Sequence, residues 1–299
     1  MKISILMATY NGEKYIAEQL ESIRNQSIVD WELLIRDDQS TDNTVAILNN
    51  YEILDSRIKV VKDNKGNLGQ LKNFSELCSL VTDSEIVFFA DQDDIWYMDK
   101  LAVTIEKYKT LTNPYKMIYT NFILWNEKSN NKKVAYESNI PLQENLLVQN
   151  WVYGCTMAIS GEICHLIKNI PEEAKNHDNW IANVAALYGE IGYINEPTMD
   201  HRLHEYNVTN TNKNKPWDKF CNFVALLKEK KVYIENKKIF VDKLIEIGEY
   251  QNITMNYLTV FDFKKLINTS GISAIRKFRE LKLTGFSKFQ SFLFCYYLL

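Results

Sequence analysis

The sequence predicts an α/β fold with a mainly parallel open sheet flanked by helices, followed by a C-terminal helical extension. Two observations lead to this prediction. Short apolar runs alternate with segments of helical periodicity four times within the first 95 residues. The run at residues 86–90 is apolar throughout, which is typical of a strand buried on both faces of a parallel sheet. With 46% hydrophobic and 24% charged residues, the chain has the composition of a soluble globular protein.

The expected elements follow from this periodicity in chain order. Strands are predicted at residues 3–8, 31–36, 57–62 and 85–90, and further strands at 117–124 and 151–160. Helices are predicted to begin near Glu13, Thr44 and Gln70, with another one carrying Leu101, Ile105 and Tyr108 on one face. Residues 126–133 are polar and predict a hairpin or a loop. A helix is also expected directly after residues 177–180.

Three carboxylates end the apolar run at residues 86–90, namely Asp91, Asp93 and Asp94. In open α/β sheets, ligands bind outside the carboxyl ends of the strands, so these acids are expected at a binding site. Such close carboxylates repel one another unless a cation lies between them, and Mg²⁺ or Mn²⁺ commonly binds carboxylates together with substrate phosphates. The stretch therefore predicts a metal ion and a diphosphate. Capping of the following helix is the alternative, although a cap needs only one acid.

Several other classes of site are disfavoured. The chain contains no G-x-G-x-x-G and no G-x-x-x-x-G-K-[ST], which argues against dinucleotide oxidoreductases and P-loop enzymes. Its five cysteines are scattered without a C-x-x-C, so neither a disulfide framework nor a zinc site is expected. The N-terminus leads directly into a strand-like run, and no apolar run reaches the length of a membrane span, so we expect a cytoplasmic protein.

The charge is distributed unevenly along the chain. Residues 213–299 contain 16 Lys and Arg against 8 Asp and Glu, a net +8, and the first 212 residues carry −11. Helices are predicted at residues 215–238, 239–250 and 272–282. Their lysines favour peripheral contact with an anionic membrane face or a homo-oligomer contact; ordinary solvated faces are the alternative. The lysines concerned are Lys228, Lys230, Lys231, Lys237 and Lys238.

Four motifs, taken in their order, resemble those of glycosyltransferase family 2, which has the GT-A fold. They span residues 7–13, 36–42, 67–69 and 90–96. The resemblance covers residues 1–212 as a catalytic domain, with a nucleotide-binding half at 1–95 and an acceptor half at 96–212, and leaves 213–299 as the basic extension. The Asp-Gln-Asp-Asp-Ile-Trp form, with a later His-Asp-Asn-Trp and His-Arg-Leu-His, is most similar to bacterial rhamnosyltransferases of surface polysaccharide assembly, such as capsule or cell wall.

The resemblance implies a role for each motif residue. The nucleotide would be bound by Thr9, Tyr10, Glu13, Asp37, Asp38, Asn67, Gly69 and Asp91. Asp93 and His204 would bind the metal and Arg202 the diphosphate, although His201 stands where the family usually has tyrosine. The acceptor would lie near Gly154, Cys155, Thr156 and Trp180. Asx-turn chemistry is the alternative for Asp37 and Asp38, and sheet core is the alternative for the region around Gly154.

Asp178 occupies the place of the catalytic acid in this family. In an inverting transfer the acceptor hydroxyl loses a proton as it attacks, and a single carboxylate within reach can accept it. Capping of the following helix is the alternative role for Asp178.

The expected function is an inverting, metal-dependent glycosyltransferase that uses Mg²⁺ or Mn²⁺. The donor would be a dTDP-sugar, with rhamnose as the sugar, or a UDP-sugar, and the acceptor a glycan or a lipid-linked glycan; no nucleic-acid partner is expected. A sugar-1-phosphate nucleotidyltransferase is one alternative, but residues 9–12 lack the Gly-rich basic loop of that class. A non-catalytic glycan-binding module is the other, and it would be expected to lose the acids that are present here.

Overall fold

The computed structural model describes residues 1–136, 143–204, 230–251, 257–283 and 288–298. The chain divides into two compact units. The first comprises Met1–Ser138, Val152–Ala185 and Gly189–Arg202, and the second comprises Asn139–Trp151, Ala186–Tyr188 and Leu203–Leu299.

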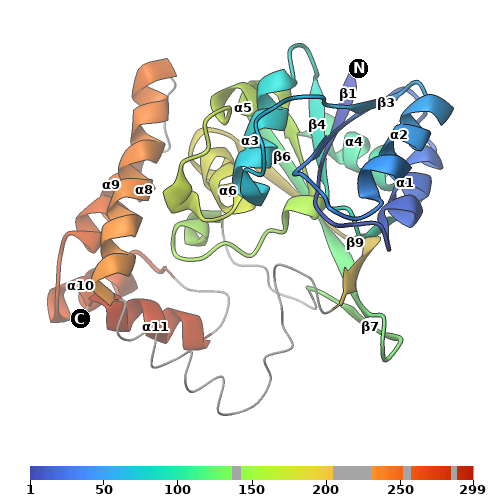
Figure 1. Cartoon of the computed structure of the whole chain (residues 1–299). Coiled ribbons are helices and arrows are strands. Elements are labelled where there is room, and N and C mark those ends of the chain that lie inside the picture. The colour runs from blue at the N-terminus through green and yellow to red at the C-terminus, as the bar shows by residue number, and fades with distance from the viewer. Residues whose placement is uncertain (137–142, 205–229, 252–256, 284–287, 299) are drawn as a thin grey trace. The chain divides into compact units, whose positions relative to one another are not determined.

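The first unit begins with four parallel strands in the order β3-β2-β1-β4. Every residue of β4 is buried, as expected for a strand covered on both faces. These strands are β1 (Ile3–Thr9), β2 (Glu32–Asp37), β3 (Ile58–Val60) and β4 (Ile86–Ala90). The helices between them are α1 (Ile16–Arg24), α2 (Thr44–Leu54) and α3 (Gly69–Leu80), so the predicted alternation is confirmed (Figure 1).

The sheet continues from β4 with strands that pair mostly antiparallel, in the order β4-β8-β6-β9-β5. The added strands are β5 (Ile95–Trp96), β6 (Lys116–Asn126), β7 (Asn131–Val134), β8 (Met157–Ser160) and β9 (Glu190–Leu203). The α/β class is thus confirmed with a mixed sheet, parallel in the first 95 residues and largely antiparallel beyond them. The polar segment near residue 130 is the β6–β7 hairpin.

Helices α4 (Lys100–Thr110) and α5 (Gly161–Leu166) belong to the first unit, and α6 (His177–Tyr188) belongs to it as far as Ala185. The predicted apolar face of α4 is buried at Leu101, Ile105 and Tyr108. The strand predicted at 151–160 is shorter in the structure, because Gly154–Thr156 form a 3-10 turn before β8 begins. Two further 3-10 turns span Gln143–Leu147 and Glu172–Ala174.

The second unit is mainly helical in the part of the chain that is described. Its helices are α8 (Lys230–Gln251), α9 (Tyr257–Ile267), α10 (Ile272–Glu280) and α11 (Lys288–Leu298). The predicted break at residue 239 is wrong, since one helix runs through it and buries Phe240 and Val241. The helix predicted from 272 is confirmed, whereas α9 was not predicted, and the start of the helix predicted at 215–238 lies outside the described residues.

Aromatic side chains hold these helices together. The rings of Phe263 and Phe278 lie 5.8 and 5.4 Å from that of Phe294, and the Tyr233 and Tyr297 rings stack at 4.2 Å. Among the described helices, none combines the length and the apolar character that crossing a bilayer requires. The side chains of Lys230 and Lys231 are outside the described part, as is the whole of Lys228, so the predicted membrane contact of this extension stays a prediction.

Gly161 tests the packing between β8 and the strand start at β4. A Cβ on Gly161 would lie 2.1 Å from the main-chain carbonyl oxygen of Ser84, which cannot move without shifting the sheet. We expect Gly161→Ala to lower the free energy of unfolding by about 1–3 kcal/mol, measured by urea denaturation. His165→Ala on the exposed side of the same helix should stay close to wild type. Equal stability of the two variants would contradict the close contact.

Candidate active site

The ends of β1, β2 and β4 bring the first predicted nucleotide residues together. Thr9 and Asp37 are paired in the β1–β2 register, and the Thr9 hydroxyl donates to Asp37 Oδ1 at 2.9 Å. The Tyr10 main chain pairs with the Gln92 side chain: its N–H donates to Oε1 at 2.8 Å, and its carbonyl accepts from Nε2 at 3.0 Å. Asp91 follows β4 at this same edge. The side chain of Tyr10 is 50% exposed, so its ring is available to a ligand.

Asp38 is buried and shapes the neighbouring loop. Its carboxylate accepts hydrogen bonds from Arg36 Nη1 at 2.9 Å and from the main-chain N–H groups of Leu68 and Gly69, each at 2.8 Å. Its carbonyl accepts from Asn67 Nδ2 at 2.8 Å. Gly69 has a φ of +77°, a left-handed conformation that favours glycine. Asp38, Asn67 and Gly69 therefore form one structural unit beside the strand ends.

Asp37 and Glu13 brace the two loops that follow β1 and β2. Asp37 accepts from the Ser40 N–H at 2.8 Å and from the Ser40 hydroxyl at 2.6 Å. These are local bonds of the kind considered as an alternative, although they reach three residues on and not the two of an Asx turn. Glu13 accepts from the main-chain and side-chain nitrogens of Asn43 at 2.9 and 2.8 Å. Asp37 is half-buried and Glu13 exposed, so both carboxylates remain accessible at the rim.

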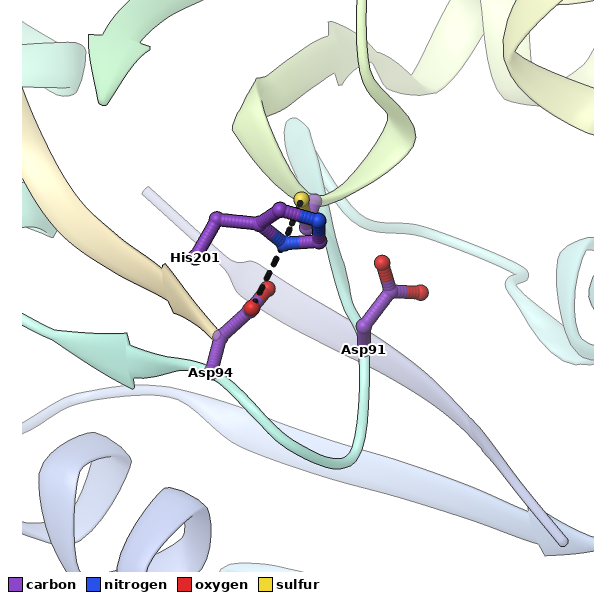
Figure 2. Close-up of side chains that lie close together, drawn as sticks. Asp91, Asp94 and His201 are labelled. Atoms are coloured by element: carbon purple, nitrogen blue, oxygen red, sulfur yellow. Dashed lines mark hydrogen bonds and ion pairs between the residues drawn. The ribbon is translucent and has the colours of Figure 1, made fainter. Parts of the chain in front are cut away.

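Four side chains that suit a metal ion converge next to this edge: Asp91, Asp94, Cys155 and His201, whose ligand atoms lie within 4.8 Å of one another. His201 Nδ1 lies 2.7 Å from Asp94 Oδ1 and 3.9 Å from Cys155 Sγ. Figure 2 shows the imidazole and the two carboxylates pointing toward one region. This cluster contains Asp94 and His201, whereas the sequence predicted Asp93 and His204. His204 follows the end of β9 and belongs to the second unit.

Strand pairing explains why these residues meet. In the antiparallel β5–β9 ladder Ile95 is opposite Asp200, so the preceding residue, Asp94, faces His201. The residues before β8, among them Cys155, come close because β8 pairs with β4. Sequence reasoning missed His201 as a site residue because a pairing across 107 positions leaves no local signal. Two hints were available: Asp94, the third acid of the motif, and the histidine at position 201 where the family usually has tyrosine.

The electrostatics of the cluster are dominated by burial and by like charges. Burial, together with the charges of Asp94 and Asp93, raises the pKa of Asp91 to about 7. Burial lowers the pKa of His201, but the charge and hydrogen bond of Asp94 outweigh it and raise that pKa to about 9. Burial and the neighbouring acids also raise the pKa of the Cys155 thiol well above its ordinary value. At neutral pH, His201 is therefore a cation among acids and Cys155 a neutral thiol.

The donor set fits a divalent cation. Asp94 Oδ2 and His201 Nε2 are buried and, among the described residues, have no hydrogen-bond partner, although buried polar atoms rarely lack one. Carboxylate oxygens suit Mg²⁺ and Mn²⁺, and an imidazole nitrogen is more readily accepted by Mn²⁺. The protonated thiol of Cys155 is a poor ligand for either ion. Asp91 and Asp94 are thus the residues best placed to hold such an ion, with His201 beside them.

Arg202 is buried and is surrounded by protein groups. Its Nε donates to the Asp93 carbonyl at 3.0 Å and its Nη1 to Glu127 at 3.0 Å, and Nη2 pairs with Glu18. The guanidinium also lies over two aromatic rings, 4.6 Å from that of Tyr15 and 4.5 Å from that of Trp125. These contacts tie β9 to α1 and to the β6–β7 hairpin. They also fix the main chain at Asp93, whose side chain is itself buried.

The predicted acceptor residues are mostly buried in the 3-10 turn before β8. Gly154, Cys155 and Thr156 lie in this turn, and a Cβ on Gly154 would stand 2.3 Å from Nε2 of the buried His177. Trp180 is 1% exposed, so its side chain forms part of the core.

Tyr153, immediately before this turn, was not among the predicted site residues. It is half-buried, and its ring lies 5.7 Å from that of His201. Burial is the main cause of the raised pKa of Tyr153, and the charge of Asp178 adds to it.

Asp178 is the second residue of α6, and the residue at the N-cap is Asn176. The carboxylate of Asp178 accepts from the main-chain N–H of Asn179 at 2.5 Å. Asp178 is therefore not the N-cap residue, although a carboxylate in the first turn is favoured by the helix dipole.

Comparison with known proteins identifies the family. The sequence model of Glycosyl transferase family 2 matches residues 4–161, a stretch that contains all four motifs. The chain belongs to glycosyltransferase family 2. The chain is similar to dTDP-rhamnosyl transferase RfbG of Shigella flexneri, with 32% identity over 217 residues, 69% of this chain and 74% of that protein. Of three further relatives the chain spans 59%, 40% and 45% of the length.

Solved structures confirm the GT-A fold of this family 2 glycosyltransferase. Staphylococcus aureus TarS in complex with UDP-GlcNAc superposes with a TM-score of 0.58 and 15% identity, covering 94% of this chain and 73% of that one. Mannosyltransferase PcManGT from Pyrobaculum calidifontis, in complex with GDP-Man and Mn²⁺, has a TM-score of 0.50 and 13% identity, covering 99% and 84%. Family membership identifies an enzyme that acts on nucleotide sugars, and neither the nucleotidyltransferase nor the non-catalytic module is supported.

The charge of His201 predicts a pH dependence of stability in protein kept in EDTA. Because its folded pKa of about 9 lies above the ordinary 6.5, its stabilisation is complete below pH 6.5 and is lost as the pH rises through 9. We expect a fall on the order of 3 kcal/mol in the free energy of unfolding across that window. His201→Gln should remove most of this fall in the free energy of unfolding. The separate loss of stability at lower pH, which is caused by deprotonation of Asp91, should remain. A wild-type stability that is constant from pH 6.5 to 9 would contradict the paired imidazolium.

Proposed function

We propose that this chain is an inverting, divalent-metal-dependent glycosyltransferase that transfers a sugar from a nucleoside diphosphate to a hydroxyl of a glycan or lipid-linked glycan. The observation that carries this proposal is the convergence of Asp91, Asp94 and His201 at the carboxyl edge of the parallel strands. The similarity to a dTDP-rhamnosyl transferase makes dTDP-rhamnose the first donor to test, with UDP-sugars next.

In this proposal the nucleotide lies over the ends of β1 and β2. The exposed ring of Tyr10 offers a stacking surface for the base, while Thr9 and Glu13 line its edge. Asp37 is the accessible acid of its pair, and its carboxylate can accept the imide N–H that a pyrimidine base presents. The loop at Asn67–Gly69, held by Asp38, forms the far wall of the nucleotide site.

The diphosphate and the metal would lie at the acid cluster. Asp91 and Asp94 would hold the ion with His201 beside them. Asp93 and His204, the ligands predicted from the sequence, remain candidates in this proposal. When bound, the ion stabilises the negative charge that develops on the leaving diphosphate. Because the Arg202 guanidinium is engaged by Glu18, Glu127 and the Asp93 carbonyl, we assign it the role of positioning the metal segment in place of direct contact with the diphosphate.

The acceptor would enter on the side of Tyr153, where an accessible aromatic ring is available to a sugar. Asp178 then serves as the base: its carboxylate takes the proton of the acceptor hydroxyl as the hydroxyl oxygen bonds to the anomeric carbon. The bond from that carbon to the diphosphate oxygen breaks, and the nucleoside diphosphate leaves. The turn at Gly154–Thr156 supports the acceptor side of the site. The ring of His177 fits against this turn because Gly154 has no Cβ.

Asp178→Asn separates a base from a structural carboxylate. The amide keeps the shape and hydrogen-bonding capacity of the side chain but is not basic, so the rate of sugar transfer should fall by roughly 10²–10⁴ with little change in donor affinity. Two quantities are measured. One is the rate of sugar transfer from a labelled donor to acceptors extracted from cells that express this protein, and the other is the donor affinity by calorimetry.

Asp91→Asn is the matched comparison, and it should weaken metal-dependent donor binding as well as transfer. Near-normal turnover in Asp178→Asn would reject the base, and lost donor affinity in that variant would move Asp178 into the donor site.

A further inference from the structure

Lys100 is a buried lysine that contacts β5 and β9, the two paired strands next to Asp94 and His201. It is the first residue of α4 and is 1% exposed. Its Nζ donates to Thr198 Oγ1 at 3.2 Å, approaches Met199 Sδ at 3.5 Å and lies 4.9 Å from the centre of the Trp96 ring. Among the described residues, no carboxylate forms an ion pair with it. The three groups that contact the ammonium group, from Thr198, Met199 and Trp96, are neutral.

This position is unfavourable for a cation in two respects. Taking an ammonium group out of water costs several kcal/mol unless an opposite charge compensates it. A positive charge in the first turn of a helix is also disfavoured by the helix dipole. Lysines normally avoid both costs by extending the ammonium group to water, which Lys100 does not do. A methionine side chain, which has a similar length and no charge, would fill the same space equally well.

The compensating charge comes from the acid cluster. Thr198 and Met199 lie on β9 shortly before His201, and Trp96 lies on β5 shortly after Asp94. Lys100 therefore contacts the same two paired strands that present Asp94 and His201. Burial lowers the pKa of Lys100 to about 8, and the ammonium group is therefore charged at neutral pH. At that pH Cys155 is a neutral thiol, so the charge of Asp94 is the one that opposes the effect of burial.

We propose that Lys100 is an internal counter-charge for the acid cluster, a positioning residue that touches neither metal nor substrate and limits the affinity of the cluster for a divalent cation. Its charge makes it possible to keep several acids close together before the ion arrives. The same charge then repels the ion, because a Coulomb interaction in a buried site is only weakly screened. A moderate affinity allows the ion to exchange along with the nucleotide product. This inference rests on the proposed metal-dependent transfer.

Lys100→Met tests the inference through its sign. Removing an internal positive charge should tighten Mn²⁺ binding by about tenfold, whereas a purely structural loss would weaken it or leave it unchanged. Binding of Mn²⁺ alone, and of Mn²⁺ with UDP, is followed by electron paramagnetic resonance of the free ion, with thermal unfolding to confirm the fold. Lys107→Met removes a charge from the same helix on a partly exposed side chain and should bind Mn²⁺ like wild type.

The other outcomes are distinct. Equal or weaker binding in a folded Lys100→Met protein overturns the counter-charge while leaving the metal-dependent function in place. A wild-type protein that binds no Mn²⁺ with or without UDP overturns both. If Lys100→Met does not fold, Lys100→Gln carries the same test, because its amide can still bond Thr198 without a charge.

Discussion

The main constraint on this structure is the electrostatic repulsion between carboxylates that the chain holds close together. The loop after β4 holds Asp91, Asp93 and Asp94 within four positions, and the burial of Asp93 and Asp94 removes most of the screening that water would provide. Three positively charged groups offset this repulsion. They are the imidazolium of His201, which is bonded to Asp94, the guanidinium of Arg202, which is bonded to the Asp93 carbonyl, and the ammonium group of Lys100. We infer that a divalent ion is the group for which this arrangement is prepared. When no ion is bound, the positive charge of protonated His201 compensates part of the negative charge of the acids.

The parallel and the antiparallel halves of the sheet position different residues of the site. The parallel half delivers strand ends to one edge, where Thr9, Asp37 and Asp91 follow directly from the register of β1, β2 and β4. The antiparallel half brings the partners of the acids, because β9 runs beside β5 and β8 runs beside β4. A helix or loop carrying His201 would be free to move away from Asp94, whereas a strand paired next to it is not. The strand pairing therefore fixes the position of His201 relative to Asp94.

The sequence predicted the parts of this arrangement that are local. The four strand–helix units, the buried strand ending in acids and the family all follow from short stretches, and the structure and the comparisons confirm them. The pair Asp94–His201 and the contacts of Lys100 depend on pairings between distant segments, which leave no periodic signal. The continuous α8 was mistaken for two helices because a lysine pair at 237 and 238 interrupts its apolar pattern without breaking the backbone. Arg202 illustrates the same limit: its type suggested an anion ligand, and only the fold revealed Glu18 and Glu127 around it.

The central claim is that the acid cluster binds a nucleoside-diphosphate sugar through a divalent ion. Its most direct measurement is the release of nucleoside diphosphate from a panel of nucleotide sugars by the purified protein, with Mn²⁺, with Mg²⁺ and with excess EDTA. We expect release from one donor, with dTDP-rhamnose tested first, in the presence of Mn²⁺ and a loss of that release in EDTA. Release that is undiminished in EDTA would contradict the account.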